Sequence, residues 1–173
     1  MKNLIIAILL LFGLTSCKKE AYHNDYERSY DALQSFKKAT GNSYYYVANT
    51  VSWSGYRSET KISVRNGAIV SRDFKNYQYE PGDTVANVLL SAWHEGADSL
   101  GVHTDTGAAL LTLDDVYTMA KNEWLKVDKS ENDIYFEVEN NGLISSCGYV
   151  PNGCMDDCFQ GIHIKEITAM AAK

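Results

Sequence analysis

Apolar residues recur every three or four positions in two stretches of the chain, which is the spacing of a helix with one buried face. The first stretch predicts a helix over about 25–39, where Asn24 and Glu27 have the spacing of a capping box. The second begins after Thr112, with Asp115 at the matching position of another capping box. We expect the second helix to bury one face, which consists of Leu113, Val116, Tyr117, Ala120 and Trp124.

Strands are predicted where apolar and polar residues alternate or where aromatic and β-branched residues cluster. Asn66-Gly67 stands between two such runs and predicts a type I′ turn, because both residues tolerate the positive φ that this turn requires. Residues 140–142, Asn-Asn-Gly, predict a second hairpin. The expected strands are 44–53, 56–65, 68–71, 134–138, 143–150 and 162–167.

Three segments between these elements are less regular. Residues 75–83 predict a loop, 85–93 favour a helix over a strand, and the glycine-containing segment 96–108 predicts an ordered loop. Neighbouring strands joined by tight turns imply antiparallel pairing. The chain is therefore expected to form an α+β domain, with an antiparallel sheet of about five to six strands and two or three helices packed on one face.

The N-terminus has the layout of an export signal. Lys2 precedes an apolar run from Leu4 to Leu14, which is shorter than the roughly 20 residues of a membrane-spanning helix. Leu14-Thr15-Ser16-Cys17 resembles the lipobox of bacterial lipoproteins. This resemblance implies cleavage before Cys17 and a thioether from its thiol to diacylglycerol; the alternative is an ordinary secretory signal with an incidental cysteine.

This interpretation divides the chain into four parts and places it in the bacterial cell envelope, periplasmic or surface-exposed. The expected partner of the protein is a membrane, to which lipid at Cys17 anchors it. The expected parts are a signal peptide (1–16), a lipidated tether (17–23), a single α+β domain (24–168) and a tail (169–173).

Composition excludes some classes of function. The 173 residues carry a net charge of −6, and no basic cluster follows Lys18-Lys19, so a nucleic-acid partner is not expected. Twelve tyrosines against two prolines are typical of a folded domain and not of a disordered tail.

The cysteines present the most specific chemical question in the sequence. In an oxidising compartment Cys147, Cys154 and Cys158 are disulfide candidates, and one of the three remains unpaired if Cys17 is lipidated. Any of the three pairings is open. With His163, the same cysteines could instead form a tetrahedral metal site or the centre of a thiol- or metal-dependent enzyme.

Two weaker candidate binding sites rest on residue type. His94 and His103 lie near carboxylates in a glycine-containing region, and Tyr44, Tyr46 and Trp53 could form an aromatic surface on a strand. Ordinary loop bonding and sheet packing are the alternatives. The chain has no nucleophile elbow, phosphate loop, His-Glu-x-x-His sequence or dinucleotide fingerprint, so an enzyme is not favoured and no cofactor is expected. We expect a module that binds a small ligand or an envelope protein.

Several segments together resemble a family of uncharacterised bacterial lipoproteins and secreted proteins of unknown function. The resemblance covers roughly residues 30–167 and is carried by 63–67, 107–117, 132–136, 141–145, 147–150 and 156–158. It implies no catalytic residue. It does imply that the C-terminal cysteine loop is a characteristic part of the fold.

Overall fold

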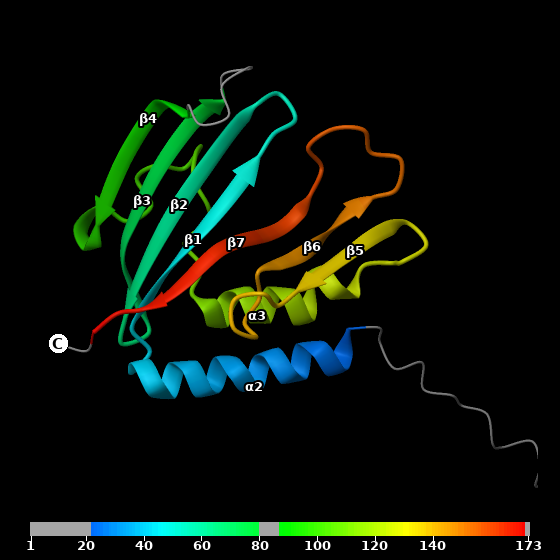
Figure 1. Ribbon diagram of the computed structural model, residues 1–173, viewed down its shortest axis with the longest axis horizontal. Helices are drawn as coiled ribbons and strands as arrows, with labels where there is room; N and C mark the ends of the chain where they lie inside the picture. Colours follow the sequence, from blue (N-terminus) through cyan, green and yellow to red (C-terminus); the bar gives the residue numbers. More distant parts are fainter. Residues whose placement is uncertain (1–21, 80–86, 172–173) are drawn as a thin grey trace, which may run out of the picture.

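Seven antiparallel strands form one sheet in the computed structural model, which describes residues 22–79 and 87–171 (Figure 1). Their order across the sheet is β4-β3-β2-β1-β7-β6-β5. The expected signal, Cys17 and residues 80–86 lie outside the described part. The strands are β1 (Tyr44–Val51), β2 (Tyr56–Arg65), β3 (Ala68–Tyr79), β4 (Asn87–Gly96), β5 (Asn132–Glu137), β6 (Ser146–Pro151) and β7 (Gln160–Ala169).

Two helices, α2 (His23–Thr40) and α3 (Leu113–Asn122), lie on the same side of this sheet (Figure 1). The core is the layer between them and the sheet, and it takes alternate residues from the central strands β1, β2 and β7. The α+β class, the antiparallel sheet and the helices on one face are thus confirmed. No helix in the described ranges has the length and apolar character needed to cross a membrane.

The two helices begin in different ways. At α3 the predicted capping box is present, since Thr112 Oγ1 accepts from the Asp115 amide at 3.2 Å and Asp115 Oδ2 accepts from the Thr112 amide at 2.8 Å. The predicted apolar face is buried throughout, although its last residue, Trp124, lies in a 3-10 turn (Trp124–Lys126) after the end of α3. The box predicted for α2 is wrong: the helix starts at His23, so Asn24 lies within its first turn, and no side chain caps it.

The Asn66-Gly67 turn is confirmed, with φ of 50° and 82° at its two residues and Arg65 paired with Ala68 across it. Both conformations lie in the left-handed region, which asparagine and glycine enter with little strain.

Two predictions about the strands are wrong, and the second explains why the sheet has seven strands where about five to six were expected. The loop predicted from residue 75 is strand as far as Tyr79, and the segment for which a helix was favoured is β4, except for residues 85 and 86, which lie outside the described part. In β4, Trp93 and Glu95 pair with inward-facing residues of β3, while His94 lies on the outer face. Pairing between β3 and β4 overrides a local pattern that also fits a helix.

Tyrosine hydroxyls connect α3 to the sheet and to the loop before β6. The Leu113 amide donates to Tyr44 Oη at 2.9 Å, Tyr46 Oη donates to the Leu111 carbonyl at 2.7 Å, and the Ile144 amide donates to Tyr117 Oη at 3.1 Å. All three tyrosines are completely buried. Burial raises the pKa of Tyr44 to about 12, so its hydroxyl stays neutral in the core.

Tyr44→Phe is expected to lower the free energy of unfolding by about 1–3 kcal/mol, because the buried Leu113 amide loses its acceptor. Tyr45→Phe is the matched control, since Tyr45 lies on the outer face of the same strand. Its effect should be within about 0.5 kcal/mol. Urea unfolding of both variants checks the difference; equal destabilisation would contradict the role given to the Tyr44 hydroxyl.

Candidate functional site: a groove between β1 and β7

The sheet opens where β1 and β7 stop pairing. Their ladder ends at the Ala48–Ile164 pair, next to a register shift that bends the strands. Beyond this pair, β1 continues to Val51 but is paired with β2 alone, and the first residues of β7 are paired with β6 alone. Figure 1 shows the two strands diverging toward the loop that precedes β7.

A groove of about 750 Å³ lies at this divergence, within the range typical of small-molecule sites. We call it the β1–β7 groove. Its lining combines residues of the sheet with two loops and the side chain of Trp124. The lining includes Thr50, Ser58, Thr60, Phe74, Asn76, Thr106, Gly107, Ala108, Trp124, Asp156, Asp157, Phe159, Ile162 and His163.

One side of the groove is formed by the loop between β4 and α3, which we call the wall loop (residues 97–111). A buried ion pair holds it against the sheet: Arg72 donates from Nε to Glu95 Oε2 at 3.0 Å and from Nη2 to Glu95 Oε1 at 2.8 Å. The same guanidinium donates to the carbonyls of His103 and Ala108 at 2.7 and 3.0 Å. The guanidinium thus bridges strand and loop.

The Glu95 carboxylate is also bonded to the wall loop. It accepts from the amides of Gly101 at 2.9 Å and His103 at 2.7 Å, and it is completely buried. The Arg72 guanidinium, aided by these amides, holds the pKa of Glu95 well below its usual range. If the wall loop moved away, the buried charges of Arg72 and Glu95 would lose hydrogen-bond partners, which costs free energy. The ion pair therefore favours one position of the loop on the sheet.

Aromatic stacking fixes the middle of the wall loop. The Trp93 ring stacks on His103 at 4.1 Å and on Phe74 at 5.1 Å between centroids, and its Nε1 donates to Thr106 Oγ1 at 3.1 Å. A Cβ at Gly107 would lie 3.0 Å from the Trp93 ring, so this position suits glycine. The loop therefore lies in close contact with the sheet at the groove.

The other side of the groove is the loop that contains the Cys154–Cys158 disulfide. Trp53, in the turn between β1 and β2, donates from Nε1 to Asp156 Oδ1 at 2.6 Å. Hydrogen bonds from the Asp157 amide and from Trp53 lower the pKa of Asp156, which keeps this carboxylate ionised at neutral pH. The turn and the disulfide loop are thus joined at one end of the groove.

Phe159 and His163 complete the lining beside two facing glycines. Their rings stack at 4.0 Å, and Ser146 Oγ is 3.0 Å from His163 Nδ1. A Cβ at Gly148 would lie 2.5 Å from Phe159, and one at Gly161 would lie 2.2 Å from the Cys147 carbonyl oxygen. Glycine at 148 lets Phe159 lie against the strands, and glycine at 161 allows the close approach of β6 and β7.

The structure separates the four residues of the predicted cysteine–histidine cluster. Cys154 and Cys158 form the disulfide, whereas Cys147 is a free, buried thiol in the core. Cys147 pairs with Ile162 across β6 and β7, so it faces the opposite side of the sheet from the neighbouring His163. Across residues 22–79 and 87–171, no group of three or more His, Cys, Asp and Glu side chains is placed to hold a metal ion.

The two histidines proposed as one binding site also lie apart. His94 is exposed on the outer face, with Nδ1 2.7 Å from Asp73 Oδ1. His103 lies on the inner side, with Nδ1 3.0 Å from Glu95 Oε1. Among the aromatic candidates, Tyr44 and Tyr46 are completely buried and do not form a binding surface, because the strand turns both toward α3. Trp53 is 79% exposed and lies beside the groove.

Most residues of the groove were missed by sequence reasoning. Thr60, Asn76 and Thr106 are ordinary residues of strands and loops, and they come together only through the sheet and the wall loop. Gly148, paired with Gly161, is the local signal that could have revealed the packing of Phe159, because glycine within a strand often marks a close approach.

The arrangement of the thiols can be checked by labelling the Cys17→Ser chain with N-ethylmaleimide. Burial raises the pKa of Cys147 to about 12, so the folded protein should take up no label. Denaturation without a reductant should expose one thiol, and reduction in denaturant should expose three. Rapid labelling of the folded chain, or label on Cys154 without reduction, would contradict this arrangement.

Comparison of the chain with protein-family models, curated proteins and solved structures finds no match. The functional interpretation is therefore based on the geometry and chemistry of the groove.

Proposed function

We propose that the protein is a lipid-anchored envelope protein whose β1–β7 groove binds a small polar ligand without net negative charge. The observation that carries this proposal is the groove itself, a cavity of about 750 Å³ held open by two loops that are each fixed in place. A pre-formed cavity with a few polar groups is the common form of a small-molecule site.

The lining of the groove supports the class of ligand. Hydroxyl and amide groups of Thr50, Ser58 and Asn76 offer hydrogen bonds, and Phe159 and Trp124 offer ring surfaces for apolar parts of a ligand. Asp156 and Asp157 add negative charge, while the described residues that line the groove include no lysine or arginine. An anionic ligand would be repelled here, and a neutral or cationic one would not.

The envelope location is supported by the resemblance of Leu14-Thr15-Ser16-Cys17 to a lipobox. Two or three acyl chains at Cys17 would hold the domain at a membrane, because each buried CH₂ contributes about 0.8 kcal/mol. The resemblance to uncharacterised bacterial lipoproteins agrees with this location. A thiol-dependent enzyme is less well supported, since Cys147 is buried with its pKa raised to about 12 and thiolate is the nucleophilic form.

Saturation-transfer NMR with three probes tests the groove: spermidine as a cation, maltose as a neutral sugar and citrate as an anion. We expect transfer to spermidine or maltose, with an affinity at least about tenfold above that for citrate, which corresponds to about 1.4 kcal/mol. The charge of Asp156 and Asp157 is the reason for this order.

Two tryptophan substitutions on β3 locate the binding. Asn76→Trp fills the groove from the sheet, whereas Lys75→Trp places the same ring on the exposed outer face of the same strand. Binding should be lost in the first variant and kept in the second. Absence of transfer to all three probes, preference for citrate, or equal effects of the two variants would contradict the proposal.

A further inference from the structure

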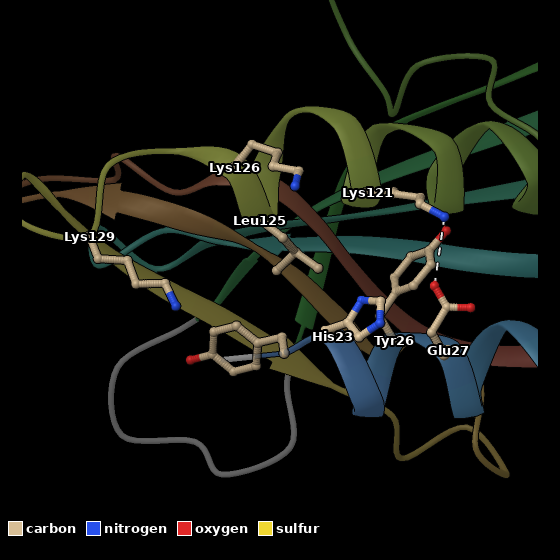
Figure 2. Close-up of a pocket in the computed structure, with 8 residues that line it drawn as sticks. His23, Tyr26, Glu27, Lys121, Leu125, Lys126 and Lys129 are labelled. Atoms are coloured by element: carbon tan, nitrogen blue, oxygen red, sulfur yellow. Dashed lines mark ion pairs between the residues drawn. The ribbon is translucent and has the colours of Figure 1, made fainter. Parts of the chain in front are cut away.

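A second, smaller pocket lies where the described chain begins. It has a volume of about 240 Å³ and lies between the start of α2 and the end of α3 with the segment that follows it. Figure 2 shows Lys121 directed toward Tyr26 and Glu27 of α2, with Lys126 nearby and Lys129 at the other end of the pocket. We call this the lysine pocket.

The lysine pocket is locally positive in a chain whose net charge is −6. Its lining includes three lysines and one glutamate, and Glu27 is 3.6 Å from Lys121 Nζ. The nearby Asp128 carboxylate accepts two hydrogen bonds from Ser130. Lys129 forms no ion pair with the described residues, and its ammonium group favours an anion as ligand.

Two of these ammonium groups are held beside tyrosine rings. Lys121 Nζ lies 5.5 Å from the centroid of the Tyr26 ring, and Lys129 Nζ lies 5.5 Å from that of Tyr22. Both lysines are exposed, so they remain hydrated and accessible at the surface. The rings restrict where the charges lie without neutralising them.

The length of the tether places this pocket close to any membrane that holds the protein. Five residue steps separate Cys17 from Tyr22, which can span no more than about 18 Å. A lipid at Cys17 would therefore hold the pocket near the headgroups at a high effective concentration, where weak phosphate contacts suffice.

We propose that the lysine pocket docks on the phosphates of anionic phospholipids in the membrane that anchors the protein. This inference rests on the proposed lipidation of Cys17, but it adds an orientation. The start of α2 faces the bilayer, and the β1–β7 groove stays open to solvent. The two sites lie on different sides of the 3-10 turn at Trp124–Lys126, since Trp124 lines the groove and Leu125 lines the pocket.

Sedimentation of the Cys17→Ser chain with lipid vesicles tests this docking without the anchor. We expect binding to vesicles of phosphatidylcholine mixed with phosphatidylglycerol, weakening as sodium chloride is added, and no binding to phosphatidylcholine alone. Lys121→Gln combined with Lys129→Gln should weaken vesicle binding about thirtyfold. Each lysine near an anionic surface contributes about 1 kcal/mol to the free energy of binding, and the double variant loses two of them.

A control pair with the same loss of charge is available on the outer face of the sheet. Lys165 is paired with Glu59 at 2.7 Å, as Lys121 is paired with a glutamate. Lys61 lies 4.2 Å from the centroid of the Tyr45 ring, as Lys129 lies beside a tyrosine ring. Lys61→Gln combined with Lys165→Gln should leave vesicle binding nearly unchanged. Matching unfolding temperatures would show that both variants fold.

Three results would overturn the docking proposal: no binding to the anionic vesicles, equal loss in the two double variants, or equally tight binding of inorganic phosphate without vesicles. Cell fractionation separates these results from a failure of the anchor. If the parent chain is found in membranes and Cys17→Ser is not, the anchor holds whatever the vesicles show. If Cys17→Ser stays in membranes even after a wash at high salt, which should release the lysine pocket, the lipidation proposal fails by itself.

Discussion

The Arg72–Glu95 ion pair joins the sheet to the wall loop, and the shape of the groove depends on it. Neither side chain is accessible enough to be solvated by water, so each polar atom must find its partner within the protein. Those partners are backbone groups of Gly101, His103 and Ala108, which places the loop at one position on the sheet. A buried pair of this kind contributes more to the position of a loop than to net stability.

The second constraint is the end of the β1–β7 ladder at Ala48 and Ile164. Had these strands continued to pair, the sheet would be closed there and no groove would form between its two halves. The disulfide loop and Trp53 instead meet at the end of this opening through Asp156, and Phe159 lies against Gly148 beside it. The groove is thus a product of where pairing stops.

Local sequence signals predicted part of this structure correctly. The capping box at Thr112 and the Asn66-Gly67 turn involve residues close in sequence, so their patterns are sufficient. β4 and the end of β3 were missed, because their state is decided by pairing with each other and not by local periodicity. Most of the groove could not be predicted for the same reason, because its residues meet only in the folded chain. Trp53 and Asp156, for example, are 103 residues apart in the sequence. The cysteine pattern indicated a disulfide but left its pairing open.

The amide exchange rates of Gly101, His103 and Ala108 test the role of the ion pair most directly. Gly101 and His103 donate to Glu95, and Ala108 donates to Thr60 Oγ1 at 2.9 Å. If the pair fixes the wall loop, these amides should exchange as slowly as amides within β2, although they lie in a loop. Arg72→Met should remove that protection while α3 stays protected. Fast exchange in the parent chain, or protection that survives Arg72→Met, would contradict this account.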